Sequence, residues 1–214
     1  MTTTDHQRRH WDRMSHVLNI TNRLFPHDRL ARTATRALRL QPGQTVLDIG
    51  CGTGPNFPAL HDALGPAGKI IAIDHSPGML AKAHQRIQRH GWTNIELHQA
   101  DISRENLGTA RADAAIAAYA FSAMPDIPAA TRNVHTALTP GGALFTYDIR
   151  QPDNAGAPLR LTYRLFTRTA GGDVLTALHD TFDTVTHIHR DGTETPPPDN
   201  PWHLMALARR HSST

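Results

Sequence analysis

The sequence predicts an α/β protein with a doubly wound, mostly parallel sheet of seven strands and an antiparallel strand pair at its C-terminal edge. From Gln44 onward, short apolar runs alternate with stretches of helical periodicity, which is the pattern of parallel strands joined by crossover helices. Near the C-terminus two strand-like runs follow each other with only a turn between them. Such a pair indicates antiparallel strands.

A single domain is expected to account for residues 1–214. The 214 residues are 39% hydrophobic, and no long Pro-, Gly- or Ser-rich linker divides them. No apolar run approaches the roughly 18 residues of a membrane span, and the first ten residues are polar, unlike a secretion signal. The only cysteine, Cys51, agrees with a reducing compartment. We therefore expect a cytoplasmic protein.

The first 40 residues are expected to be helical. Trp11, Met14 and Leu18 recur at roughly helical spacing and lie opposite Arg and His residues. A second amphipathic helix is expected over Arg29–Leu40, before the helix-ending pair Pro42-Gly43.

The rest of the chain divides into short strands and helices, each identified by its own period. Helices are expected at Pro58–Leu64, Pro77–His90, Pro128–Leu138 and Asp173–Asp180. Strands are expected at Thr45–Ile49, Lys69–Asp74, Asn94–Ala100, Ala112–Tyr119, Gly142–Ile149, Phe182–His189 and Trp202–Arg210.

Charge and histidine usage exclude two classes of partner. The formal net charge is only +3, and no cluster of Lys and Arg is interleaved with aromatic residues, so we expect no nucleic-acid partner. The 15 histidines are scattered, and His187 and His189, which share a strand face, have no evident third ligand. We therefore expect no metal.

The stretch VLDIGCGTGPNF, residues 46–57, places Gly50, Gly52 and Gly54 directly after the first expected strand. Open α/β sheets bind ligands at the carboxyl ends of their strands, where glycines let the backbone approach a ligand closely. Asp74 ends the second strand, the position from which a carboxylate reaches ribose hydroxyls. A nucleoside or nucleotide ligand follows, and the G-x-G-x-G spacing argues against a nicotinamide dinucleotide.

Residues 44–150 resemble the class I S-adenosylmethionine-dependent methyltransferases. VLDIGCGTG is similar to motif I of that family, IIAIDHSPGMLAKA to its second motif, LHQADI to its third, and ALTPGG to the segment before its fifth strand. These motifs occur in the family's order and spacing, so the resemblance implies a Rossmann-like fold and S-adenosylmethionine as cofactor, with S-adenosylhomocysteine as product.

The resemblance assigns cofactor contacts to individual residues. Asp48 would order the loop or bind the ammonium group, Asp74 would accept the ribose hydroxyls, His75 and Met79 would cover the adenine, and Asp101 would accept from its amino group. Cys51 is interpreted as a small residue in a tight loop and not as a nucleophile. The cofactor-binding residues would be Asp48, Gly50, Cys51, Gly52, Gly54, Asp74, His75, Met79, Asp101, Ile102 and Tyr119.

Residues 1–40 are more loosely similar to the leader of the ubiquinone, menaquinone and phospholipid N-methyltransferase branch, in which an N-terminal helix closes over the cofactor. The resemblance implies a helical lid at 1–40, a cofactor-binding core at 44–150, and a substrate-side segment with the strand pair at 151–214. YAFSAMPDIP, residues 119–128, is also typical of this branch. The acceptor wall would then include Trp11, Phe121, Ser122, Met124, Tyr147 and Asp148.

The expected activity is methyl transfer to a small or medium-sized organic acceptor by in-line displacement, in secondary metabolism or in lipid or quinone metabolism. We assign no catalytic base, and nitrogen, oxygen and carbon acceptors stay open. The basic segment with Arg160, Arg164 and Arg168 suits an acidic or lipid-like acceptor or is a solvated helix face, and a basic arm suits weak membrane-surface contact. Monomer and homodimer both stay open. The alternatives are a non-methyl reaction on the same fold, a binding module without catalysis, and a nicotinamide-dependent dehydrogenase.

Overall fold

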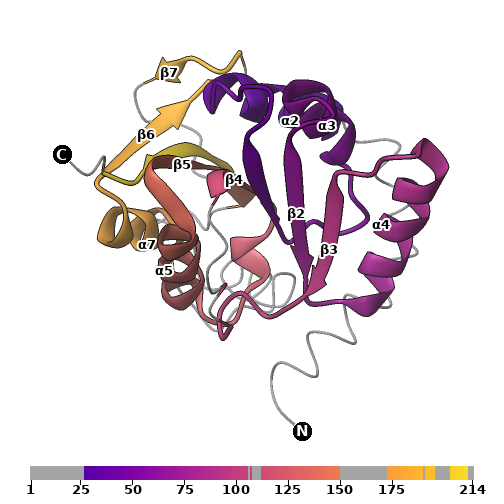
Figure 1. Cartoon of the computed structure of the whole chain (residues 1–214). Helices are drawn as coiled ribbons and strands as arrows, with labels where there is room; N and C mark the ends of the chain where they lie inside the picture. The colour runs from indigo at the N-terminus through magenta and orange to yellow at the C-terminus, as the bar shows by residue number, and fades with distance from the viewer. Residues whose placement is uncertain are drawn as a thin grey trace, which may run out of the picture.

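One mixed β-sheet with helices on both faces forms the described part of the chain (Figure 1). The computed structural model describes residues 27–105, 107, 112–149, 173–189, 191–195 and 203–211. The strand order is β3-β2-β1-β4-β5-β8-β6-β7. The predicted helix around Trp11 and the segment with Arg160, Arg164 and Arg168 lie outside the described residues.

The parallel half of the sheet confirms the predicted alternation of strands and helices. Helices α3, α4 and α5 cross between consecutive parallel strands, whose pairing runs β3-β2-β1-β4-β5. The strands are β1 (Thr45–Ile49), β2 (Lys69–Asp74), β3 (Ile95–Gln99), β4 (Ala112–Ala118) and β5 (Leu138–Ile149). The helices are α2 (His27–Ala37), α3 (Phe57–Leu64), α4 (Pro77–His90) and α5 (Ile127–Ala137).

The C-terminal strands confirm the predicted antiparallel addition at one edge of the parallel sheet, but they number three instead of two. Helix α7 (Val174–Thr181) precedes β6 (Thr184–Ile188), β7 (Glu194–Thr195) and β8 (His203–Arg209). Strand β8 pairs antiparallel with both β5 and β6, so it lies inside the sheet and not at its edge. The sheet has eight strands instead of seven because the chain folds back after β6 and the two-residue β7 pairs with β6.

The two faces of the sheet are covered by different helices and hold two separate apolar clusters. Val46 of β1 packs in the cluster under α2, α3 and α4, and Leu47 packs in the cluster under α5 and α7. This alternation follows from the two-residue period of a strand, which sends successive side chains to opposite faces. In Figure 1, α5 and α7 lie side by side on one side of the sheet, away from α3 and α4.

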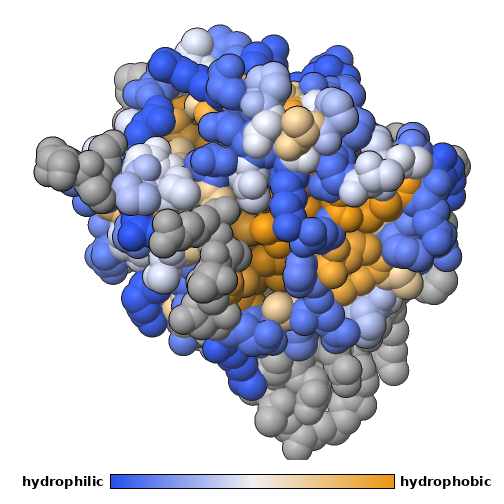
Figure 2. Space-filling view, in the orientation of Figure 1, coloured by the Kyte–Doolittle hydropathy of each residue, from blue (hydrophilic) through white to orange (hydrophobic). Residues whose placement is uncertain are grey.

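Strand β3 forms one edge of the sheet and is protected by charge. Its Ile95 is buried, whereas its Glu96 is exposed and pairs with Lys69 of β2 at 2.8 Å. Figure 2 shows apolar surface across the middle and right of this face, crossed near the centre by a column of hydrophilic residues. Exposed charges on an edge strand disfavour pairing with another chain.

No helix within the described ranges is long and apolar enough to cross a bilayer.

Candidate functional site

The loop between β1 and α3 has a backbone that needs glycine. Gly50, Gly52 and Gly54 all have positive φ angles, of 62°, 55° and 76°. A Cβ atom at Gly50 would lie 2.7 Å from the Cβ of Ala120, and one at Gly54 would lie 2.3 Å from the ring of Phe57. At Gly52 a Cβ would meet nothing within 4 Å. Packing therefore requires two of the glycines, and the third leaves bare backbone beside open space.

Asp74 ties the end of β2 to this glycine loop. Its Oδ2 accepts a hydrogen bond from the Gly52 N–H at 2.8 Å, and its Oδ1 accepts one from the Ser76 N–H at 2.8 Å. Ser76 in turn caps helix α4 by accepting from the Met79 N–H at 3.1 Å. Each carboxylate oxygen can accept a second hydrogen bond. Asp74 can therefore hold the loop and still accept hydroxyl donors from a ligand.

Asp48 is a fully buried carboxyl group at the end of β1. Its Oδ1 accepts a hydrogen bond from the Asn56 Nδ2 at 3.0 Å, and its Oδ2 has no hydrogen-bond partner. Burial raises the pKa of Asp48 to about 7; the Asn56 hydrogen bond lowers it, and the nearby charge of Asp74 raises it further. Desolvation disfavours the charged form, so a cationic donor at Oδ2 would favour ionisation.

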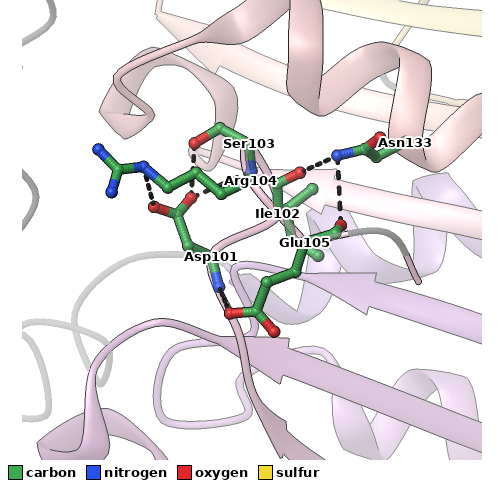
Figure 3. A network of polar contacts seen from close by, with 6 residues as sticks. All are labelled: Asp101, Ile102, Ser103, Arg104, Glu105 and Asn133. Atoms are coloured by element: carbon green, nitrogen blue, oxygen red, sulfur yellow. Dashed lines mark hydrogen bonds and ion pairs between the residues drawn. The ribbon is translucent and has the colours of Figure 1, made fainter. Parts of the chain in front are cut away.

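Asp101 lies in the turn that follows β3, and Figure 3 shows its contacts. Its Oδ1 accepts from the backbone N–H and from the hydroxyl of Ser103, at 3.0 Å and 2.6 Å. Its Oδ2 is buried and has no hydrogen-bond partner, although the Nε of Arg104 lies 3.6 Å away. Asp101 therefore keeps one oxygen for a further donor.

Buried polar atoms without a hydrogen-bond partner gather at the carboxyl ends of β1, β2 and β3. Among the described residues, four of the six such side-chain atoms belong to this edge: Asp48 Oδ2, Asn56 Oδ1, His75 Nε2 and Asp101 Oδ2. Leaving a buried polar atom unsatisfied costs free energy, so such a cluster calls for an explanation. Three of the four are oxygens that accept hydrogen bonds, which suits a ligand rich in donors. S-adenosylmethionine, with its ammonium, ribose hydroxyl and amino groups, is such a ligand.

The other predicted cofactor residues lie around this edge with their side chains buried. Met79 is in the first turn of α4, and Ile102 follows Asp101 and packs against the core. Burial raises the pKa of the Cys51 thiol well above its usual value, and the charges of Asp74 and Asp48 add to this effect. Cys51 therefore stays protonated, which agrees with a packing role and not with a nucleophile.

Tyr119 has a strained backbone at the end of β4, with φ of 56° in a residue other than glycine. Its N–H donates to the Tyr147 carbonyl at 2.7 Å, and the two rings meet edge to face with centroids 4.9 Å apart. Burial and the hydrogen bond to Tyr147 raise the pKa of the Tyr119 hydroxyl. Strain of this kind is typical of functional sites, and Tyr119 is the one large apolar side chain that is exposed within the described ranges.

The predicted acceptor wall divides into half-buried and buried members. Tyr147 and Met124 are half-buried. Phe121 is fully buried in the core, so its side chain packs under the turn at 121–123 and does not form a surface wall. Asp148 is also fully buried, and its Oδ2 accepts from the Ser122 N–H at 3.1 Å. Asp148 and Phe121 thus position this turn from below; Trp11 lies outside the described residues.

Sequence reasoning missed two polar residues that complete the site, Asn56 and Ser103. An asparagine just before a helix usually caps that helix. Asn56 precedes α3 but makes no side-chain cap bond, because its amide turns to Asp48 instead. Ser103 follows Asp101 by two residues, and the side-chain turn that Asp forms with such a neighbour could have been predicted. No group of three or more metal-ligating side chains occurs in the part of the chain that the structure describes.

Comparison with known proteins finds similarity to methyltransferases. A family profile described as "Methyltransferase domain" matches residues 46–142. The demethylmenaquinone methyltransferase of Geobacillus stearothermophilus is 27% identical over 143 residues, which are 67% of this chain. The chain spans 59% of the length of that relative.

Solved structures share the fold at low sequence identity. A SAM dependent methyltransferase from Aquifex aeolicus matches with a TM-score of 0.62 and 20% identity, over 84% of this chain and 88% of its own. The (4+2)-cyclase SpnF matches with a TM-score of 0.65 and 18% identity, over 87% of this chain and 82% of its own. At these identities the likeness shows the fold alone.

Proposed function

We propose, since this chain belongs to the class I S-adenosylmethionine-dependent methyltransferases, that it transfers a methyl group from S-adenosylmethionine to a small or medium-sized organic acceptor. The observation that carries the proposal is the set of unpartnered acceptor atoms gathered beside a bare glycine backbone. A ligand rich in hydrogen-bond donors would satisfy these atoms. The whole activity is a proposal because the chain spans only part of its relatives.

The strand ends carry hydrogen-bond acceptors that suit three donor groups of the cofactor. Asp48 Oδ2 suits the ammonium group, Asp74 the ribose hydroxyls, and Asp101 Oδ2 the adenine amino group. Met79 and His75 would cover the adenine, and the backbone around Gly52 would approach the methionine part. The bound cofactor supplies a methyl group activated on a sulfonium.

The chain's own contribution to the reaction is alignment and exclusion of water. Methyl transfer is an in-line displacement, so holding both reactants in place supplies much of the rate enhancement. Tyr119 and Tyr147 lie at the ends of neighbouring strands, β4 and β5, where an acceptor would enter. Burial and the hydrogen bond to Tyr147 raise the pKa of Tyr119, so its hydroxyl keeps its proton. Tyr119 therefore does not act as a general base, and we assign its exposed ring to the surface that an acceptor meets.

The acceptor class rests on the similarity to quinone methyltransferases. The Geobacillus relative is named for demethylmenaquinone. We propose a quinone-like, lipid-like or secondary metabolite acceptor for this chain, bound without a nucleic-acid partner. A weak membrane-surface contact and a monomeric or homodimeric state belong to the same proposal, and the single buried thiol, Cys51, suits the cytoplasm.

Calorimetric titration with S-adenosylmethionine, S-adenosylhomocysteine and NAD tests the cofactor assignment. We expect micromolar binding of the first two and none of NAD. Asp74→Ala should weaken binding by roughly 1.5–3 kcal/mol, the scale of hydrogen bonds to a charged group. Glu96→Ala, which removes an exposed carboxylate from the neighbouring strand, is the matched control and should not change affinity. Unchanged affinity in Asp74→Ala would contradict the proposed site.

Product mass separates methyl transfer from other uses of the same fold. A structure named as a (4+2)-cyclase shares this fold, so the fold alone leaves a non-methyl reaction as the alternative. We expect a candidate acceptor to gain one methyl group while S-adenosylhomocysteine accumulates. A product of unchanged mass would indicate a rearrangement or cyclisation, and cofactor binding without turnover across the acceptor panel would indicate a binding module.

A further inference from the structure

The turn after β3 is held by contacts on both of its sides (Figure 3). Within the turn, the Asp101 N–H donates to the Glu105 Oε1 at 3.0 Å, and the Arg104 and Glu105 N–H groups donate to the Asp101 carbonyl at 2.9 Å and 2.8 Å. These are bonds between near neighbours in sequence. They shape the turn but do not fix where it lies relative to the sheet.

Asn133, on helix α5, ties this turn to another layer of the molecule. Its Nδ2 donates to the Ile102 carbonyl at 2.7 Å and to the Glu105 carbonyl at 3.2 Å. An amide nitrogen has two hydrogens, so both donors are used on the turn. The neighbouring Val134 is fully buried, which fixes this part of α5 in the core. Asn133 therefore connects a rigid helix to residues on either side of Ser103.

The direction of the Asp101 carboxylate depends on where the turn lies, because only one of its oxygens is hydrogen-bonded. Oδ1 accepts two hydrogen bonds from Ser103, whereas Oδ2 is buried without a hydrogen-bond partner. Arg104 approaches Oδ2 only at 3.6 Å and its side chain is mostly exposed, so it makes a weak ion pair. The direction of Oδ2 is thus set by the position of the turn.

We propose that Asn133 is a positioning residue for adenine recognition: it holds the 101–105 turn so that Asp101 Oδ2 meets the amino group of the base. The proposal rests on the proposed binding of S-adenosylmethionine. It predicts that Asn133 controls selectivity for the purine and not affinity alone. A site built to hydrogen-bond one group rejects an analogue that lacks it, but only while its polar groups are held in place.

The test compares binding of S-adenosylhomocysteine with binding of S-inosylhomocysteine, in which a carbonyl replaces the amino group. We expect the wild type to prefer the adenosyl compound strongly and Asn133→Leu to lose about tenfold or more of that preference, since small misplacements have effects of this size. Asp101→Asn, which changes the contact itself, should lose the preference too. Thr136→Val, an exposed change one turn along α5 whose hydroxyl bonds only to its own helix, should keep it.

Each outcome decides between the proposal and its alternatives. If both ligands weaken equally in Asn133→Leu, or if the preference is unchanged, Asn133 is only a structural residue and the proposal is wrong. If Asn133→Leu does not fold, Asn133→Ala takes its place, and loss of folding in both would also overturn the proposal. A wild type that binds neither ligand would instead contradict the proposed function.

Discussion

At the scale of single residues, the site consists of polar side chains that hydrogen-bond to each other but leave some of their acceptor atoms without a partner. Asp48 and Asn56 share one hydrogen bond, and each keeps an unpartnered oxygen. Both side chains are buried, Asp48 on β1 and Asn56 directly before α3, so water does not bond to the unpartnered oxygens. Unpartnered buried acceptors lower the stability of the ligand-free protein, and a ligand that donates hydrogen bonds to them gains binding free energy. Such a compromise between stability and function is common at functional sites.

Asp48→Asn should change how stability depends on pH. The pKa of Asp48 is about 7 in the folded protein and near its ordinary value when unfolded. Between about pH 4 and 7 the folded state keeps a proton that the unfolded state releases, so stability falls as pH rises through this window. Urea unfolding should show this fall in the wild type, up to roughly 4 kcal/mol, and a flatter profile in Asp48→Asn.

Cofactor affinity should show the opposite trend. An ammonium donor at Asp48 Oδ2 favours the carboxylate, so S-adenosylhomocysteine should bind about fivefold more tightly at pH 7 than at pH 6. Asp48→Asn should bind weakly at both values. An unchanged pH dependence in the variant would assign the titration to another group.

Gly52→Ala and Gly54→Ala should separate binding from folding. A methyl group at Gly54 would clash with the fully buried Phe57 ring in addition to the backbone strain, so we expect a loss of roughly 2–5 kcal/mol in unfolding free energy. At Gly52 only the strain applies, about 1–2 kcal/mol, because the space beside it is open. Gly52→Ala should therefore fold and lose cofactor affinity. Normal affinity in a folded Gly52→Ala protein would mean that no ligand approaches this backbone.

At the scale of elements, the parts of the site are held by contacts between neighbouring layers. Helix α5 carries Asn133 at its centre and is itself fixed at its C-terminal end by Arg210, which follows β8. The Arg210 Nη1 donates to the carbonyls of His135, Thr136 and Leu138. The last carbonyls of a helix have no partner within the helix, so a cation there both bonds and complements the helix dipole.

Arg210→Ala should lower the unfolding free energy by roughly 1–2 kcal/mol, since three carbonyls lose a charged donor. Arg209→Ala is the matched control: the same residue type one position earlier makes an exposed ion pair with Glu194 at 3.2 Å. Such a pair is worth about 0–1 kcal/mol. Urea unfolding of both variants tests the difference, and equal losses would show that the helix end needs no cap.

At the scale of the whole molecule, the sheet separates two apolar clusters within the described part of the chain. One lies under α2, α3 and α4, and the other under α5 and α7. The carboxyl ends of the parallel strands meet along one edge, and the candidate site lies there. The fold therefore supplies the scaffold, and the loops after β1, β3 and β4 supply the chemistry.

Deleting residues 1–25 should leave unfolding cooperative but lower the methyltransferase activity, because we interpret this arm as a lid and not as core. Urea unfolding and product formation, measured on the full chain and on the deletion, test both expectations. A broad transition in the shortened protein would place the arm in the folding core, and full activity would exclude a lid.

The sequence by itself determined the types of most elements. The predicted bounds of β1, β2 and α4 agree with the structure, because strand alternation, helix period and the Pro77 start signal are local properties. Motif I and its spacing to Asp74 likewise predict a nucleoside site from local residues alone.

Only the tertiary structure decided how distant residues meet. No local sequence pattern predicts three features of the structure. These are the position of β8 between β5 and β6, the burial of Phe121 and Asp148, and the hydrogen bond from Asn133 to a turn some 30 positions away. Each follows from packing the layers together, and the physical reason is the same throughout. Which face is buried and which polar atoms go unpaired is determined only when non-local segments exclude water from one another.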